Sequence, residues 1–188
     1  DQYDKKPSII VNQGSHDLIR ECLKKYNKKA ELIIQKKQIG MGNAVLQFKK
    51  SKKYKITKNI LLIWGDIPFI KKSTVLKLII SHNNNNNDYT LISKYVKNPY
   101  TIIKRDKKKK IISIEETYKS KKKINNGERD IGLFLFNKKL IFQYLISDFY
   151  NKYNKHNKEH GFLYLVEHLV KMGYKIESLP FASSKEVI

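Results

Sequence analysis

Asp66 is the residue of this 188-residue chain whose surroundings best suit metal or phosphate chemistry. It follows an apolar run at 59–64 and lies between Gly65 and a turn that contains Pro68. A carboxylate at the end of a buried strand can bind Mg²⁺, which takes one or two carboxylates and keeps its other positions for water and phosphate oxygens. The same residue could instead only cap the turn before the next helix. The spacing alone leaves both interpretations open.

A second candidate is the segment 35–44 (QKKQIGMGNA), in which a strand runs into a glycine-containing loop and then a helix. Glycine lets the backbone approach a ligand closely, and a helix N-terminus favours a phosphate or another polar group. The side-chain amide of Gln35 or Gln38 could pair with a nucleobase. Because a lone Gly-x-Gly also occurs in ordinary strand–helix turns, a purely structural role stays open here too.

Acidic residues form a third group. Glu115 and Glu116 end one expected strand, and the segment 128–130 (ERD) begins another. These acids could contact sugar hydroxyls, or they could be ion-paired with neighbouring lysines. The five histidines and Cys22 show no metal-ligand spacing, so no zinc site is expected. Cys22 lies on the apolar face of an expected helix and is predicted to be a core residue.

The elements that must position these residues alternate between strand and helix over the first eighty residues. We expect strands at 8–12, 31–35 and 59–64 and helices at 16–26, 42–49 and 73–82. The run 59–64 (NILLIW) is apolar throughout, which is typical of a central parallel strand covered on both faces. The pattern predicts an α/β fold with a doubly wound, mostly parallel sheet. In such folds ligands bind at the carboxyl ends of the strands, where Asp66 lies.

A polar connection at 83–87 (NNNNN) is expected to be a mobile loop, and the pattern changes after it. Strands are expected at 89–95, 100–105, 111–115, 130–136 and 174–180, with a loop at 119–128 and helices at 138–150 and 162–172. The strands 100–105 and 111–115 are joined by a lysine-rich turn, which predicts a hairpin.

The composition is strongly basic, with 39 Lys and Arg residues against 17 Asp and Glu and a formal net charge of +22. All but three of the basic residues are lysines, whereas phosphate and base recognition favours arginine. The many lysines, asparagines and isoleucines are more simply explained by an A/T-rich genome. The single cysteine excludes an internal disulfide framework. No apolar run reaches the ~18 residues of a membrane span.

Taken in order, these segments resemble the sugar-1-phosphate nucleotidyltransferases. QKKQIGMGNA at 35–44 resembles that family's Q-x-x-Q-L-G-T-G-H-A segment, and LLIWGDIPF at 61–69 resembles its L-x-x-Y-G-D-x-P-L segment. The likeness continues through 98–100, 114–116, 130–132 and 159–165. Within that family, the chain resembles the uridylyltransferase domain of the bifunctional bacterial enzyme that makes UDP-N-acetylglucosamine. The resemblance implies a Rossmann-like, GT-A-like α/β fold, with a mixed but mostly parallel sheet flanked by helices, and a cytoplasmic enzyme.

The resemblance also implies a reaction and a set of roles. A sugar-1-phosphate, for which N-acetylglucosamine-1-phosphate is one candidate, would attack the α-phosphorus of UTP or another nucleoside triphosphate and release pyrophosphate. Asp66 would be the catalytic residue and the ligand of Mg²⁺, the implied cofactor. The nucleotide-binding residues would be Gln35, Gln38, Gly40, Met41 and Gly65, and the sugar-binding residues would be Trp64, Thr101, Glu115 and Asp130. No membrane and no specific nucleic acid is expected as a partner, and assembly into a homo-oligomer stays open.

The chain departs from the family at both ends. The family's G-x-G-T-R-M loop should precede Asp1, and its second metal ligand should follow Ile188. The chain is therefore expected to be one nucleotidyltransferase domain, 1–188, that is incomplete at both ends and inactive by itself. Its nucleotide-binding part would span about 1–82 and its sugar-binding part about 88–188.

Three internal departures bear on the reaction. Met41 replaces a threonine, Thr101 replaces a glycine and Asp130 replaces an asparagine of the family pattern. They leave open a non-catalytic regulatory subunit that binds a sugar nucleotide. A lysine-rich nucleic-acid-binding protein is the third interpretation, and it predicts an affinity that falls steeply with salt.

Overall fold

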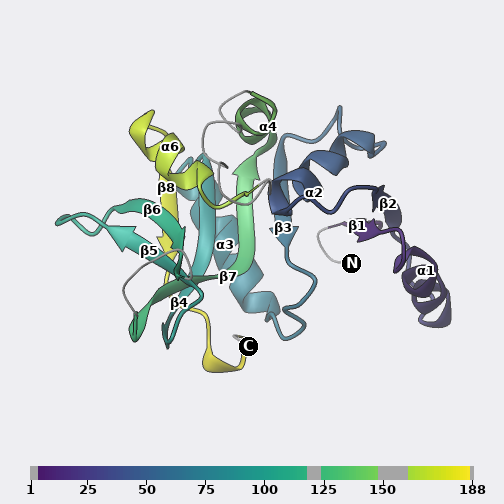
Figure 1. The fold of residues 1–188 in the computed structure, drawn as a ribbon, viewed down its shortest axis with the longest axis horizontal. Coiled ribbons are helices and arrows are strands. Elements are labelled where there is room, and N and C mark those ends of the chain that lie inside the picture. The colour runs from purple at the N-terminus through teal and green to yellow at the C-terminus, as the bar shows by residue number, and fades with distance from the viewer. Residues whose placement is uncertain (1–3, 118–123, 148–160, 187–188) are drawn as a thin grey trace. The chain divides into compact units, whose positions relative to one another are not determined.

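The computed structural model describes residues 4–117, 124–147 and 161–186. The chain forms two compact units, of residues 1–57 with 142–162 and of residues 58–141 with 163–188. Figure 1 labels their helices and strands. Both units combine strands with helices, so the predicted α/β class is confirmed.

The first unit contains a two-stranded parallel sheet. In it β1 (Ser8–Asn12) pairs with β2 (Glu31–Gln35), and α1 (His16–Lys25) connects the two strands. The side chain of Asn12 fixes the turn before α1, because its Oδ1 accepts hydrogen bonds from the N–H and the hydroxyl of Ser15 at 2.8 and 2.7 Å. These three elements agree with the sequence-based expectation.

Two further helices follow β2 in the first unit, α2 (Met41–Gln47) and the 3-10 helix η1 (Phe48–Lys50). Ser51, which follows these helices, is hydrogen-bonded to Glu31 of β2. The Glu31 carboxylate accepts hydrogen bonds from the hydroxyls of Ser8 and Ser51 at 2.9 and 2.5 Å. These bonds lower the pKa of Glu31, although its partial burial acts in the opposite direction.

The second unit is built on a four-stranded sheet in the order β3-β7-β4-β8. Its strands are β3 (Asn59–Ile63), β7 (Asn126–Asn137), β4 (Tyr89–Lys97) and β8 (Ile176–Leu179). β7 runs antiparallel to both of its neighbours, and β8 runs parallel to β4. The sheet is therefore mixed.

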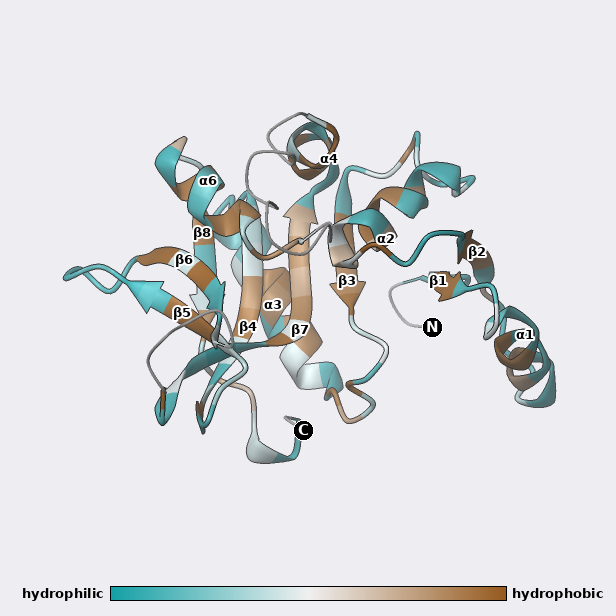
Figure 2. Ribbon diagram, viewed as in Figure 1, coloured by the Kyte–Doolittle hydropathy of each residue, from teal (hydrophilic) through white to brown (hydrophobic). Residues whose placement is uncertain are grey.

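The core of the second unit lies along β7. Every residue of this strand between its first and its last is buried, and Figure 2 shows the apolar stretch that follows its polar beginning. Helix α3 (Lys72–Asn84) packs on the sheet through Val75 and Leu78, which join Ile92 and Ile131 in one cluster of buried side chains. The central strand thus carries its residues 128–130 into the interior together with the apolar ones.

The expected hairpin is formed by β5 (Thr101–Arg105) and β6 (Ile111–Glu116) in the second unit. It is held to the main sheet by Arg105, whose Nε and Nη2 each donate a 2.7 Å hydrogen bond to the carboxylate of Glu128 on β7. The hydroxyls of Ser93 and Ser178 donate to the same carboxylate at 2.5 and 3.0 Å. Burial acts to raise the pKa of Glu128, but the hydrogen bonds and the charge of Arg105 hold it below its usual range.

The remaining described elements are α4 (Lys138–Ile146), α6 (Leu165–Lys171) and the 3-10 helix η3 (Ser184–Glu186). Helix α6 packs against the hairpin strand β6. The buried Glu186 anchors η3, because its carboxylate accepts hydrogen bonds from the N–H of Lys71, just before α3, and from the N–H and hydroxyl of Ser183. Across the described residues, no helix is long and apolar enough to cross a membrane.

The prediction of a mostly parallel sheet is not confirmed. β1–β2 and β4–β8 are parallel, but the other three strand pairs of the described chain are antiparallel. The apolar run at 59–64, expected to be a central parallel strand, forms β3 at the edge of its sheet, antiparallel to β7, with Ile63 exposed. The run is apolar because β3 covers the core on one side, and the central position belongs to β7.

Two smaller predictions are also wrong. Cys22 is exposed rather than buried, because no residue of α1 reaches the core. The connection at 83–87 begins as the last turn of α3 and ends in Asn87, which is buried and donates hydrogen bonds to Thr90 at 3.1 Å and Glu177 at 2.6 Å. The expected loop at 119–128 and helix at 138–150 lie partly outside the described residues.

Candidate functional site

Asp66 lies at the carboxyl end of β3 in the second unit, as the sequence predicts. Its side chain is exposed, and no hydrogen bond or ion pair engages its carboxylate among the residues that the structure describes. It therefore does not cap the turn before α3, and that helix begins after Lys71 without a side-chain cap. A single exposed carboxylate with open coordination positions is the kind of ligand that Mg²⁺ takes from a protein.

The segment that carries Asp66 is fixed to β7 by Trp64. The backbone N–H of Trp64 donates a 2.9 Å hydrogen bond to the carbonyl of Gly132. Gly132 has φ +77°, and a Cβ at this position would lie 2.7 Å from Cγ of Trp64 and closer still to Cδ1. Only glycine therefore allows the indole to pack so closely on the strand. The ring of Phe134 completes the contact from 5.3 Å, measured between centroids.

Thr101 and Asp130, two predicted sugar-binding residues, are brought together in the same part of the second unit. The hydroxyl of Thr101 donates a 2.7 Å hydrogen bond to Oδ1 of Asp130, and the N–H of Gly132 donates to Oδ2 at 3.1 Å. Asp130 is 1% exposed and Thr101 is 2% exposed. Burial raises the pKa of Asp130, and these hydrogen bonds together with the charge of Arg129 oppose that rise. Both side chains thus bond to each other within the protein, and a contact with sugar stays a prediction.

Tyr100 and Arg129 join this cluster, although neither residue was predicted from the sequence to belong to the site. The guanidinium carbon of Arg129 lies 4.0 Å from the centre of the Tyr100 ring. Burial and the charges of Asp130 and Asp66 raise the pKa of Tyr100 to about 12, while Arg129 acts in the opposite direction. The one available signal was that Arg129 is one of only three arginines in a chain that otherwise uses lysine.

Glu115 does not join these residues through any interaction found in the described structure. It lies on β6 opposite Ile102, and its carboxylate forms an ion pair with Nζ of Lys104 at 2.6 Å. Both side chains are about half exposed. The ion-paired alternative for this acid is therefore the one observed, and sugar binding by Glu115 stays a prediction.

The predicted nucleotide loop lies in the first unit and is organised by Gln35. Its Nε2 donates to the carbonyl of Gly40 at 3.3 Å and to Oδ1 of Asn43 at 3.0 Å. Gly40 has φ +100°, which favours glycine, while Gln38 is exposed and Met41 is half-buried. The amide of Gln35 thus closes the loop, and base recognition by this loop stays a prediction. Asn43, which anchors the loop, was missed because nothing in its type or spacing distinguishes it.

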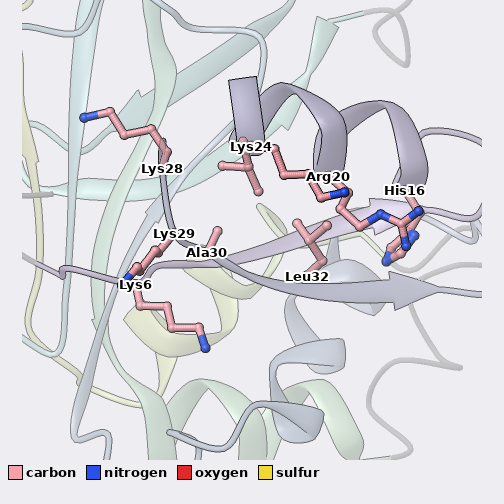
Figure 3. A pocket seen from close by; sticks show the side chains of 9 residues that line it. Lys6, His16, Arg20, Lys24, Lys28, Lys29, Ala30 and Leu32 are labelled. Atoms are coloured by element: carbon pink, nitrogen blue, oxygen red, sulfur yellow. The ribbon is translucent and has the colours of Figure 1, made fainter. Parts of the chain in front are cut away.

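A hollow of about 450 Å³ in the first unit is lined by basic side chains of the α1 region (Figure 3). Its lining residues are Lys6, His16, Arg20, Leu23, Lys24, Lys28, Lys29, Ala30 and Leu32. Figure 3 shows that Lys6 and Lys28 extend away from one another. Asp17 and Glu21 form ion pairs with Arg20 and Lys24, which offset part of the positive charge. Because these basic side chains point in different directions and part of their charge is neutralised by ion pairs, the hollow is an open basic surface and not a site whose cations converge on one anion.

The fold and the clustered residues define a class, a mixed α/β protein with an exposed carboxylate beside aromatic and buried polar side chains at a strand end. Comparison with known proteins narrows this class. No protein-family model matches the chain. The chain is 32% identical over 143 residues to bifunctional protein GlmU of Pseudothermotoga lettingae, a match that covers 74% of this chain and 30% of the relative.

Bifunctional protein GlmU of Buchnera aphidicola subsp. Baizongia pistaciae is 32% identical over 150 residues, 72% of this chain and 33% of the relative. That of Thermodesulfovibrio yellowstonii is 29% identical over 187 residues, 96% of this chain and 39% of the relative. The resemblance inferred from the sequence is confirmed, and the chain is related to part of bifunctional protein GlmU. It spans about a third of the length of these curated relatives.

Proposed function

We propose that the protein is a sugar-1-phosphate nucleotidyltransferase that transfers a uridylyl group from UTP to a sugar-1-phosphate, with N-acetylglucosamine-1-phosphate as the candidate substrate. In this reaction a phosphate oxygen of the sugar phosphate forms a bond to the α-phosphorus of UTP. The bond from that phosphorus to the β-phosphate breaks, and pyrophosphate leaves. The similarity to bifunctional protein GlmU and the order of the Gly40 and Asp66 segments support this proposal.

The observation that carries the proposal is the exposure of the Asp66 carboxylate at the end of β3. An exposed carboxylate with no protein partner among the described residues, at the carboxyl end of a strand, fits the ligand set of Mg²⁺. Mg²⁺ bound there would neutralise charge on phosphate oxygens as it develops. The protein's own residues would hold and align the substrates, because phosphoryl chemistry of this kind is catalysed mainly by positioning and electrostatic stabilisation.

In the second unit, different residues would hold different parts of the site in place. Trp64 packs closely on Gly132 and thereby fixes the backbone that carries Asp66. The Thr101–Asp130 hydrogen bond fixes the start of β5 next to β7, so that the hairpin keeps one position relative to Asp66. In the first unit the bonds made by Gln35 hold the glycine loop in one conformation, as a nucleobase site requires.

The test is pyrophosphate release by the full-length gene product with Mg²⁺, over a grid of nucleoside triphosphates and sugar-1-phosphates. We expect activity with UTP, and a loss of at least about a hundredfold in Asp66→Asn, which removes the charge but keeps the shape. Lys107→Gln, on the exposed hairpin turn, is the matched control for a change of one charge. Unchanged turnover in Asp66→Asn would overturn the metal assignment.

A second candidate is a non-catalytic subunit that binds a sugar nucleotide. The interlocked Thr101–Asp130 pair favours it, because both departures from the family pattern bond to each other and are almost fully buried. The same grid separates the two functions. Binding of UDP-N-acetylglucosamine without pyrophosphate release in any combination would establish the second.

A further inference from the structure

The loop that joins Asp66 to helix α3 is bonded at its far end to Glu186, a residue that the proposed function has not used. The N–H of Lys71, the last residue before α3, donates a 2.9 Å hydrogen bond to Oε1 of Glu186, which lies 115 positions further along the chain. Figure 1 shows the yellow C-terminal stretch beside the loop between β3 and α3. The loop that carries Asp66 is therefore held by a residue remote in the sequence.

The Glu186 carboxylate is fully engaged by the protein. Its Oε2 accepts hydrogen bonds from the N–H and the hydroxyl of Ser183 at 2.9 and 2.8 Å. Thr74, in the first turn of α3, also stabilises the ionised carboxylate through a side-chain hydrogen bond. Because both oxygens have partners and the residue is 2% exposed, Glu186 holds protein groups in place and is not itself open to a ligand.

Glu186 does for α3 what a residue of the helix itself usually does. In a capping box, an acidic side chain at the third helical position accepts the backbone N–H of the N-cap residue. The third residue of α3 is Thr74, and the N-cap residue Lys71 makes no side-chain cap bond. Glu186 supplies the acceptor instead, and its negative charge lies at the helix end where a carboxylate is stabilising.

Asp66 depends on such anchors, because no hydrogen bond or ion pair engages its carboxylate within the described residues. On one side of it, the N–H of Trp64 is bonded to β7 at 2.9 Å. On the other side, Ile67 and Ile70 pack against the buried cluster of the second unit, and the bond from Lys71 to Glu186 follows. The place of the carboxylate is therefore set by the backbone on both sides of it.

We propose that Glu186 is a positioning residue for Asp66, which it holds in place through Lys71 and the start of α3. This inference rests on the proposed function, because it concerns the carboxylate assigned to Mg²⁺. It gives the second unit a further requirement for metal binding, a buried side chain more than a hundred positions away that touches neither the metal nor a substrate.

The test measures the affinity of the full-length protein for UTP by calorimetry, once with Mg²⁺ and once with a chelator. Removal of a group that orients a metal ligand typically weakens metal binding by about 10–100-fold. Since Glu186 acts through the backbone, we expect Glu186→Ala to weaken UTP binding with Mg²⁺ by about tenfold, the lower end of that range. Binding of UTP without Mg²⁺ should stay within about twofold of the parent.

The matched control is Glu177→Ala, which removes a carboxylate from the opposite end of the same helix. Glu177 accepts a 2.7 Å hydrogen bond from Ser81 in the last turn of α3. This variant should lose stability but bind UTP with Mg²⁺ as the parent does. Ser183→Ala, which leaves the bond from Lys71 in place, should also bind as the parent does.

Glu186→Gln provides a second variant if Glu186→Ala does not fold. A glutamine side chain has one acceptor oxygen in place of two, so either Lys71 or Ser183 loses its acceptor. Its binding of UTP with Mg²⁺ should be weaker than that of Glu177→Gln but stronger than that of Glu186→Ala. Equal affinities of Glu186→Gln and Glu177→Gln would overturn the positioning role.

The outcomes separate this inference from the proposed function. Parent-like binding by Glu186→Ala, or an equal loss with and without Mg²⁺, would overturn the positioning role. If Asp66→Asn then still loses the effect of Mg²⁺, the proposed function is unaffected. A parent protein whose affinity for UTP is not raised by Mg²⁺ would overturn both the metal role of Asp66 and this inference.

Discussion

Replacement of Gly132 by alanine should destabilise the second unit through two separable effects. The backbone of Gly132 has φ +77°, where a residue with a Cβ costs roughly 1–2 kcal/mol. The new Cβ would also lie 2.7 Å from Cγ of Trp64 and 3.0 Å from its Cβ, so the indole or β7 would have to move. Overpacking of this kind typically costs about 1–3 kcal/mol. The free energy of unfolding should therefore fall by about 2–5 kcal/mol.

Two other glycines of the second unit isolate the contributions. Gly173 has φ +80° but open space around a Cβ, so Gly173→Ala should show the backbone cost alone. Gly65 has neither a positive φ nor a neighbour within 4 Å, so Gly65→Ala should be neutral or slightly stabilising. Urea unfolding followed by the fluorescence of Trp64, the single tryptophan of the sequence, measures all three. Equal stability of Gly132→Ala and Gly173→Ala, with unshifted Trp64 emission, would refute the close contact.

Two further predictions concern buried carboxylates. Glu128→Gln leaves the Arg105 guanidinium without its ionised partner. The free energy of unfolding, measured in urea, should therefore fall by about 3–5 kcal/mol. A fall of less than about 1 kcal/mol would mean that solvent screens the ion pair. For Glu186, burial alone would raise the pKa, but the hydrogen bonds it accepts lower it from 4.5 to about 2. Because the folded-state pKa is the lower one, its contribution is present above about pH 4.5 and is lost as the pH falls towards 2. Unfolding of Glu186→Gln should depend less on pH in that window, and identical pH profiles would contradict the assignment.

Local pattern was sufficient to place most elements, because the strands at β1, β2 and β6 and the helix α1 each carry their own periodicity or turn chemistry. The pairing of the strands, in contrast, could not be predicted from local pattern. The run in β3 shows that the strand is apolar, but not that β7 takes the central place and pairs with it antiparallel. That arrangement depends on contacts between residues more than sixty positions apart, which local periodicity does not encode.

In α1, likewise, the amphipathic pattern does not predict which residues are buried. The spacing of Leu18, Ile19 and Cys22 correctly describes one side of a helix, but it does not say whether anything covers that side. Leu18 is 74% exposed and Cys22 is exposed too, within the part of the chain described. A pattern therefore predicts which face is apolar, and burial follows only from packing.

The same distinction between local pattern and contacts of distant residues applies to the candidate site. The position of Asp66 at the end of a strand could be predicted because strand, turn and carboxylate are consecutive in the sequence. The Arg129–Tyr100 stack and the Thr101–Asp130 hydrogen bond could not, because each joins residues 29 positions apart in the sequence. The sequence does show which residue types stand at these positions, and the structure adds which of them bond to one another.

The Thr101–Asp130 hydrogen bond gives the departures from the family pattern at these two positions a common physical reason. A buried carboxylate must receive hydrogen bonds or a compensating charge, whereas an asparagine amide is uncharged and can both donate and accept hydrogen bonds. Asp130 receives a hydroxyl from Thr101, the N–H of Gly132 and the charge of Arg129. A glycine at position 101, as in the family pattern, would leave Oδ1 of Asp130 without its shortest hydrogen bond. Thr101 thus supplies the hydrogen bond that the buried Asp130 carboxylate needs, so each of the two departures from the family pattern stabilises the other.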